Sequence, residues 1–200
     1  MNPQNPLSKN GKAILWTRQH EHSLNDLKTE GVFRIKYNYL YENYHDITTY
    51  YTKLYKWFVA EASSMVPKPE KVEYPIWCSV SPENTLPAIE GTVVYELEID
   101  ESEVIYFDGS KWDYVLNHHY VAKNPDDLRK YQEEMYIKGF KGLDLFSLVD
   151  GPKGKLYPDE RDKVIKSWIR VFDIDSWDVF KVQGNIWEFN ENHIKKIIYP

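Results

Sequence analysis

Apolar residues recur at helical spacing in several stretches of this sequence. The longest stretch covers residues 46–65, where apolar side chains fall three or four positions apart from Ile47 to Ala62 and predict one apolar face on a long helix. Pro67 and Pro69 follow and end this helix. The same spacing predicts helices over 20–31, 126–138 and 158–172, and a short helix or turn over 112–119.

A period of two identifies the strands. From Val93 to Ile99 apolar residues alternate with polar ones, the polar stretch 100–102 turns the chain, and the apolar run 104–107 returns. This pattern predicts a β-hairpin. Residues 140–158 are rich in glycine and proline and predict a loop. Further strands are predicted over 13–17, 74–81, 181–189 and 194–199.

Strands therefore begin, interrupt and end the chain, without the regular strand–helix alternation that is typical of a parallel sheet. The sequence predicts an α+β fold with a mixed, mainly antiparallel central sheet and flanking helices. Because the chain has 200 residues and neither a repeat nor an evident linker, we expect a single domain over residues 1–200.

Composition narrows the class of protein. The chain is 42% hydrophobic and 28% charged, which is typical of soluble globular proteins, and no apolar run approaches the ~20 residues that span a bilayer. The stretch 1–12 lacks the apolar core of a signal peptide, so we expect a cytoplasmic protein without a membrane partner. The net charge of -6 opposes nonspecific nucleic-acid binding, so we expect nucleic acid only as a local acceptor.

Few residues indicate metal or nucleophilic chemistry. His20 and His22 are two positions apart and His118 and His119 are adjacent, and singly hydrogen-bonded imidazoles explain both pairs without a metal. Cys78 is the single cysteine and has no basic partner nearby in the sequence.

Aromatic residues are abundant, at 16% of the chain with seven Trp and sixteen Tyr. Flat rings of this kind can line a pocket and stack on nucleobases, sugars or a nicotinamide ring. A tyrosine-rich core and surface is the plainer interpretation.

Seven segments, spread over nearly the whole chain, form a distinctive combination of motifs. They are LWTRQ (15–19), GVFR (31–34), YPIW (74–77), VVYELEID (93–100), WDYVLN (112–117), KSWIRVFD (166–173) and VQGNIWEF (182–189). In combination they resemble an uncharacterised bacterial family catalogued as a domain of unknown function. That resemblance implies membership and no established activity.

The two ends of the chain support a second, more distant resemblance. The opening is a predicted strand ending in LWTRQ, a helix and Gly31, and the close is Gln183-Gly184-Asn185, a strand and HIKKI. In this order the pieces are similar to motifs of ADP-ribosyltransferase folds, particularly those that modify DNA bases. The resemblance implies an ADP-ribosyltransferase-like architecture that binds NAD or a related nucleotide.

The resemblance also implies a role for particular residues. Thr17, Arg18 and Gln19 would hold the cofactor, Trp77 and Trp112 would stack on it, Ser79 would hydrogen-bond to it, and Gln183 or Asn185 would orient the ribose as the catalytic residue. If the protein is an enzyme, the reaction is displacement of nicotinamide at the ribose anomeric carbon, with transfer of ADP-ribose to an unknown acceptor.

Departures from the family pattern bear on activity. The His or Arg expected in the first motif is Thr17 or its neighbour Arg18, and the glutamate expected in the last is Asn185. An amide offers only a dipole where a carboxylate would stabilise an oxocarbenium-like transition state. Glu96 and Glu98 have the spacing of paired catalytic glutamates, but their alternation with apolar residues favours the solvent face of a strand.

The step Gln183-Gly184-Asn185 has two interpretations. Gly184 would let the backbone approach a ligand closely between two amides, or the step is a bulge or tight turn that leads into an edge strand. The nucleotide hypothesis requires the first and last sheet segments to lie side by side and to form a cavity together. The alternative is a noncatalytic protein-binding module, such as an inhibitor or antitoxin-like partner, whose exposed aromatic residues contact another protein.

Overall fold

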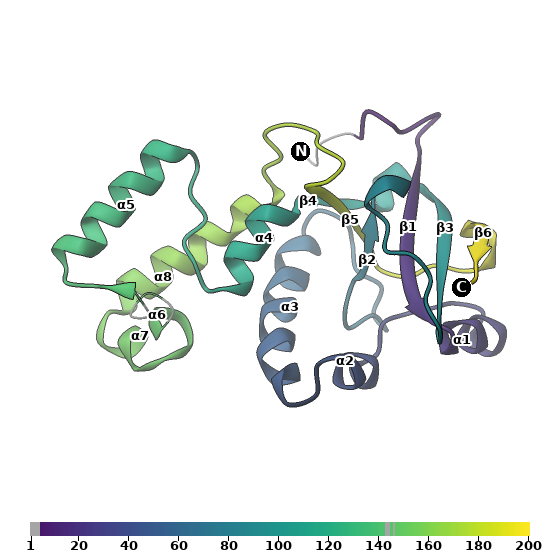
Figure 1. Ribbon diagram of the computed structural model, residues 1–200, viewed down its shortest axis with the longest axis horizontal. Coiled ribbons are helices and arrows are strands. Elements are labelled where there is room, and N and C mark those ends of the chain that lie inside the picture. The colour runs from purple at the N-terminus through teal and green to yellow at the C-terminus, as the bar shows by residue number, and fades with distance from the viewer. Residues whose placement is uncertain (1–4, 143–144, 146) are drawn as a thin grey trace. The chain divides into compact units, whose positions relative to one another are not determined.

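The computed structural model describes residues 5–142, 145 and 147–200, and the chain forms two compact units (Figure 1). The first comprises Met1–Phe107 and Ile174–Pro200 and contains a β-sheet with helices on both of its faces. The second comprises Asp108–Asp173 and is helical in its described part.

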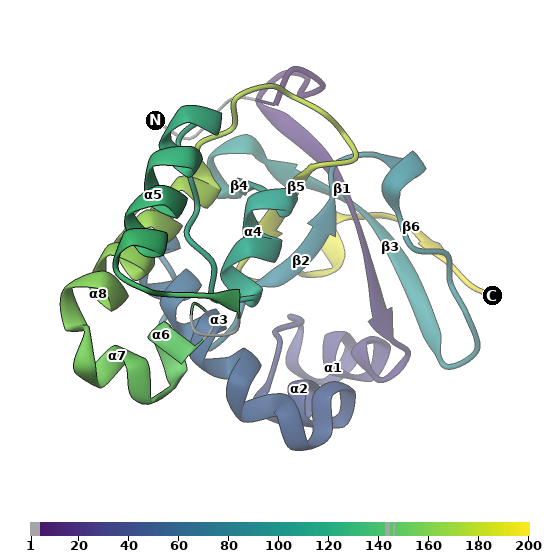
Figure 2. The same ribbon diagram turned by 60° about the vertical axis from the view of Figure 1, so that its left-hand side comes forward.

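A six-stranded sheet organises the first unit, in the order β4-β5-β2-β1-β3-β6 (Figure 2). β1 and β3 pair in antiparallel register along the whole of β1, from Lys12 opposite Asp100 to His20 opposite Thr92. β1 with β2, β2 with β5, and β3 with β6 are antiparallel as well. The strands are β1 Lys12–His20, β2 Ile76–Ser79, β3 Thr92–Asp100, β4 Ile105–Asp108, β5 Val182–Ile186 and β6 Ile194–Ile198.

The predicted hairpin is wrong, although both of its strands exist. β3 pairs with β1 and β6, whereas β4 lies beside β5 at the other edge of the sheet. Both faces of β4 are covered, since the Tyr106 ring packs on Trp177 and the Phe107 ring packs on Phe58. A simple hairpin leaves one face of each strand in solvent, whereas both faces of β4 pack against other side chains.

One face of the sheet forms the main hydrophobic core. β2 contributes Ile76 and Cys78 to this core, and β3 contributes every second residue from Val93 to Ile99, because alternate side chains of a strand lie on the same face. The helix α1, His22–Glu30, covers this face with Leu27 and ends at Gly31, whose φ of 72° is the left-handed conformation that glycine adopts most easily.

The opposite face of the sheet is covered by α3, Thr48–Ala62. Its Tyr55 and Phe58 rings pack within 5.3 Å of the Trp77 ring of β2, measured between centroids. The apolar face predicted for this helix is therefore confirmed from Leu54 to Ala62, whereas Ile47 precedes the helix and is exposed. A further helix, α2 Tyr37–Tyr44, precedes it and was not predicted, because tyrosine at every second position from Tyr37 to Tyr41 lacks the spacing of three and four that indicates a helix.

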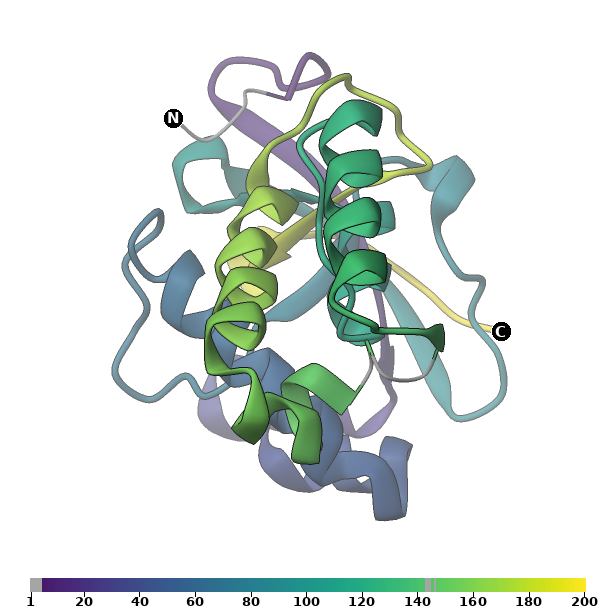
Figure 3. The same ribbon diagram turned by 90° about the vertical axis from the view of Figure 1, so that its left-hand side faces the viewer.

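The second unit consists of α4 Gly109–Leu116, α5 Pro125–Ile137, α6 Ser147–Asp150, α7 Pro152–Leu156, α8 Pro158–Ser167 and a 3-10 turn over Trp168–Phe172. α5 and α8 lie side by side (Figure 3), joined by ion pairs from Lys138 to Glu160 and from Lys163 to Glu134. The side chain of Asn124 caps α5 by accepting a hydrogen bond from the Asp127 N–H.

The loop predicted over residues 140–158 is wrong where α6 and α7 form, and its residues 143, 144 and 146 lie outside the described part of the chain. Gly154 explains the error. A Cβ atom at this position would lie 2.2 Å from the carbonyl oxygen of Leu148, so the glycine permits close helix packing and does not mark a loop. The α+β class, the antiparallel sheet and the flanking helices are confirmed.

Candidate functional site

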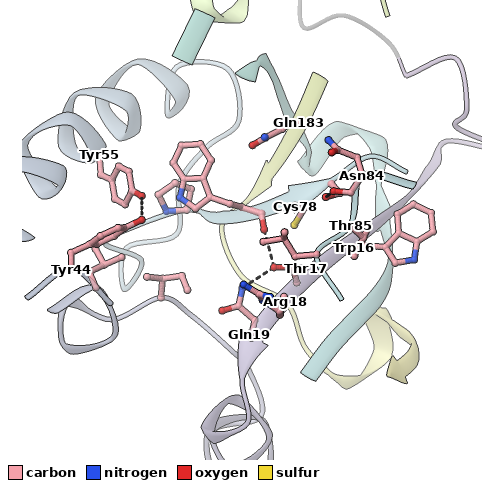
Figure 4. Close-up of a pocket in the computed structure, with 16 residues that line it drawn as sticks. Trp16, Thr17, Arg18, Gln19, Tyr44, Tyr55, Cys78, Asn84, Thr85 and Gln183 are labelled. Atoms are coloured by element: carbon pink, nitrogen blue, oxygen red, sulfur yellow. Dashed lines mark hydrogen bonds between the residues drawn. The ribbon is translucent and has the colours of Figure 1, made fainter. Parts of the chain in front are cut away.

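A cavity of about 440 Å³ opens where β1 and β2 part from each other (Figure 4). The two strands share only one paired position, Trp16 opposite Ser79. Beyond it the Thr17 hydroxyl donates a hydrogen bond to the Trp77 carbonyl oxygen at 2.8 Å, across the point where the backbones separate. This β1–β2 cavity is lined by Trp16, Thr17, Arg18, Gln19, Ile35, Leu40, Tyr44, Tyr55, Pro75, Trp77, Cys78, Ser79, Asn84, Thr85, Leu86 and Gln183.

Six of the predicted site residues line this one cavity, although three separate parts of the sequence supply them. They are Thr17, Arg18 and Gln19 of β1, Trp77 and Ser79 of β2, and Gln183 of β5. The sheet brings them together because β2 lies between β1 and β5, with Ser79 directly opposite Gln183.

Hydrogen bonds fix several of these side chains. The Gln19 amide donates to the Thr17 hydroxyl at 2.7 Å, and this hydroxyl donates in turn to the β2 backbone. Arg18 donates to the Pro87 carbonyl oxygen at 3.2 Å. The Ser79 hydroxyl donates to the Asn84 carbonyl oxygen at 2.9 Å, which ties the loop after β2 to the wall of the cavity.

Two other predicted residues lie elsewhere. Asn185 is completely buried and donates its amide to the Ile76 carbonyl oxygen at 3.2 Å, outside the lining of the cavity. Trp112 belongs to α4 of the second unit, where it is 6% exposed.

Two geometric expectations about the last strands are wrong. β5 is not next to β1, because β2 separates them. Gly184 does not bring the backbone close to a ligand: its α-carbon faces the core, where an added Cβ would lie 3.2 Å from Leu15 and 3.3 Å from Val104. A side chain there would have to displace these two neighbours by a few tenths of an ångström, so the glycine suits the close packing between β5 and its neighbours.

Sequence reasoning missed one wall of the cavity. Tyr44, at the end of α2, and Tyr55, within α3, join their hydroxyls at 2.9 Å, and the Tyr44 ring stacks on Tyr51 with centroids 4.2 Å apart. Burial and the neighbouring Tyr44 raise the pKa of Tyr55, so its phenol stays neutral. The only signal for this wall was the density of tyrosine over residues 37–55.

The ionisable groups restrict the chemistry of the β1–β2 cavity. Burial raises the pKa of the Cys78 thiol to about 12, which keeps the sulfur protonated and poorly nucleophilic at neutral pH. Arg18 is the one charged residue among the described lining residues. Glu98 pairs with Lys195 at 3.0 Å and Glu188 pairs with Arg34 at 2.6 Å, both away from this lining. The described lining of the cavity therefore offers aromatic rings, amides and one guanidinium, and no carboxylate for acid–base catalysis.

A second cavity of about 580 Å³ continues from the first. Both share Arg18, Gln19, Ile35, Leu40 and Tyr44 as lining residues. We name it the histidine cavity; its other lining residues are His20, His22, Ser23, Phe33, Tyr39, Glu42 and Thr92. Each volume lies within the range of about 300–1,000 Å³ that small-molecule sites occupy.

The fold and the site define an α+β protein whose antiparallel sheet parts between two strands to form a polar and aromatic groove. The chain belongs to the family described as domain of unknown function (DUF3841), whose model matches residues 14–195. Comparison with curated proteins and with solved structures found no match. None of the helices in the described part of the chain combines the length and the apolar character that a membrane crossing requires.

Proposed function

We propose that this protein binds NAD or a related nucleotide in the β1–β2 cavity, in the manner of ADP-ribosyltransferase folds. The supporting observation is the convergence of Gln19 and Gln183, which are far apart in the sequence, on one cavity with an aromatic wall. An amide side chain both donates and accepts hydrogen bonds, as recognition of a carboxamide or of ribose hydroxyls requires.

Trp77 is the residue that best suits a flat ring. Three aromatic rings, those of Tyr55, Phe58 and Phe107, pack around its indole with centroids 5.2–5.3 Å away, so it is held in place before a ligand arrives. Stacking on such a fixed ring is worth about 1–3 kcal/mol for a nucleobase.

The proposed function is nucleotide binding first and transfer of ADP-ribose second. Breaking the bond from nicotinamide to ribose builds positive charge on the sugar, which a carboxylate stabilises far better than an amide. Among the described lining residues, β5 contributes the amide of Gln183 and no carboxylate. We therefore expect NAD to bind without fast turnover.

Thermal unfolding with and without nucleotides tests this proposal. A ligand at one hundred times its dissociation constant should add about 2.7 kcal/mol, a shift of roughly 5–10 °C for a chain of this size. Gln183→Ala should reduce the shift for NAD, whereas Gln132→Ala, at an exposed position of α5, should not. A melting temperature that stays constant with NAD, ADP-ribose and mononucleotides would refute nucleotide binding.

A noncatalytic protein-binding module is the second candidate. In the second unit, Tyr136 and Ile137 at the end of α5 are 72% and 83% exposed, and Leu156 at the end of α7 is 73% exposed. Exposed large apolar residues of this kind are common in protein interfaces. The same melting experiment separates the two candidates, since a protein-binding module gives no nucleotide-dependent shift.

A further inference from the structure

The two ends of the groove differ in charge. In the β1–β2 cavity, the charged member of the described lining is Arg18, and the other lining residues are aromatic, apolar or neutral polar. The histidine cavity adds His20 and His22 to Arg18, with Glu42 as its one carboxylate among the described lining residues. One end therefore suits a neutral ring, whereas at the other end Arg18 and Glu42 balance each other and the two imidazoles decide whether an anion is attracted.

The geometry of the two histidines is specific. His20 ends β1 and His22 begins α1, and their rings lie 4.2 Å apart at an interplanar angle of 58°. The backbone N–H of His22 donates to His20 Nδ1 at 3.2 Å. This bond makes Nδ1 the acceptor of the neutral ring, so Nε2 holds the proton and can donate it to a ligand.

An anion beside the two rings can accept from the Nε2–H of His20 and is attracted by any positive charge on His22. A metal ion would be the other common ligand of paired histidines. However, the described residues include no group of three or more His, Cys, Asp or Glu side chains that could hold one. An anion is therefore the ligand that the charges of this cavity favour.

We propose that the histidine cavity binds the phosphates of a nucleotide whose ring occupies the β1–β2 cavity. This inference rests on the proposed function and specifies it further: the ligand is a phosphorylated nucleotide, and His20 and His22 with Arg18 neutralise its charge. Arg18 lines both cavities, so a single ligand can contact it from either side. Charge-assisted hydrogen bonds to phosphate are about twice as strong as neutral ones.

The proposal predicts that nucleotide binding depends on pH. Imidazole gains its charge between about pH 8 and pH 5, and an anion bound to the imidazolium form strengthens as the pH falls. The other groups that face the histidines from β1 and α2 are Arg18, Tyr39, Tyr44 and Glu42. Arginine keeps its charge over this interval. Burial raises the pKa of Tyr39 to about 12, so that phenol stays neutral as well.

Calorimetric titration of the whole protein with NAD tests this dependence, because the diphosphate of NAD keeps its charge between about pH 8 and 6. We expect NAD to bind about tenfold more tightly at the lower pH, a change equivalent to about 1.4 kcal/mol. The double variant His20→Gln/His22→Gln should lose this gain and bind about tenfold more weakly than the unmodified protein at the lower pH. His119→Gln, at an exposed histidine of the second unit, is the matched control and should leave the gain intact.

Adenosine and nicotinamide, which lack phosphate, should show no pH dependence in the same titrations. NAD affinity that stays constant with pH, or a double variant that gains affinity as the unmodified protein does, would overturn the phosphate assignment. If that happens while Gln183→Ala still weakens NAD binding, the proposed function stands and only the phosphate site is refuted. If neither NAD nor adenosine binds at either pH, both proposals are refuted.

The melting temperature of the double variant verifies that the variant is folded. We expect it to be unchanged because both histidines are exposed.

Discussion

Cys78 shows how burial sets the chemistry of a single residue. Its thiol lies within β2, on the side of the sheet that faces the main core, and is nearly inaccessible. Removing a thiolate from water is costly, so burial raises its pKa to about 12, and the Thr17 side chain offsets only part of this effect. Although Cys78 borders the β1–β2 cavity, it is a packing residue in the folded protein.

Thiol labelling measures this directly. With an aromatic disulfide reagent, the folded protein should react far more slowly than the chain unfolded in guanidinium, because only the thiolate attacks the reagent. A rise from about pH 7 to 9 should accelerate labelling of the unfolded chain, whose thiol has an ordinary pKa, and leave the folded protein nearly unlabelled. Labelling of the folded protein at the rate of the unfolded chain would show that Cys78 is an accessible nucleophile. Cys78→Ala serves as the blank.

At the scale of elements, the junction of β1 and β2 is the feature that creates the site. Thr17 bridges the strands with its side chain at the place where the backbones separate, and it also accepts the Gln19 amide. A continuous ladder of backbone hydrogen bonds would leave no cavity there. A polar side chain in a buried position of β1 therefore joins the two strands at the edge of the opening.

Thr17→Val should destabilise the protein because valine keeps the shape of threonine but leaves the Trp77 carbonyl oxygen without its donor. A buried group that loses its partner costs about 1–3 kcal/mol, which urea unfolding would detect as a lower midpoint. Thr29→Val is the matched control: the Thr29 hydroxyl donates to the Asn25 carbonyl oxygen at 2.8 Å on the exposed surface of α1. We expect less than about 0.5 kcal/mol there. If both variants lose the same free energy of unfolding, the hydrogen bond between the strands contributes no more to stability than an exposed one.

The sequence predicted the type of most elements but not their partners. Alternation located β2 and β3, because a strand with one buried face has a period of two whatever lies beside it, and a short apolar run located β1. The same alternation does not say which strands pair, and the hairpin between β3 and β4 was therefore wrong. Gly154 and Gly184 were misread for a related reason: close packing requires glycine as often as a turn does, and only the packed structure distinguishes the two.

The candidate site was predicted in part for a similar reason. Thr17, Gln19 and Gln183 are polar residues next to apolar ones, a pattern that can be recognised in the sequence alone. The tyrosines of α2 and α3 resemble ordinary core residues in the sequence, and their position against β2 is a property of the tertiary structure. Asn185 has the same local appearance as Gln183 and lies on the same face of β5, two residues further along, but it is completely buried there and donates to the Ile76 carbonyl oxygen.

At the scale of the whole molecule, the described residues that line both cavities belong to the first unit. The chain returns to this unit after the helical second unit, and β5 then supplies Gln183 beside β2. We therefore expect substitutions in the two units to separate ligand binding from stability. Two tryptophans make this comparison well matched: Trp77 lines the β1–β2 cavity, and Trp112 lies in α4 of the second unit.

Trp77→Phe and Trp112→Phe each remove the same atoms from an aromatic side chain that packs against its neighbours, so each should lower the free energy of unfolding by about 1–2 kcal/mol. Only Trp77→Phe should also weaken NAD, by about fivefold, which corresponds to about 1 kcal/mol of lost stacking. Titration well below both melting temperatures measures affinity in the folded protein alone. If Trp112→Phe weakens NAD binding as much as Trp77→Phe does, then Trp112 takes part in binding as the resemblance to ADP-ribosyltransferases implies, and the expected separation of the two tryptophans is refuted.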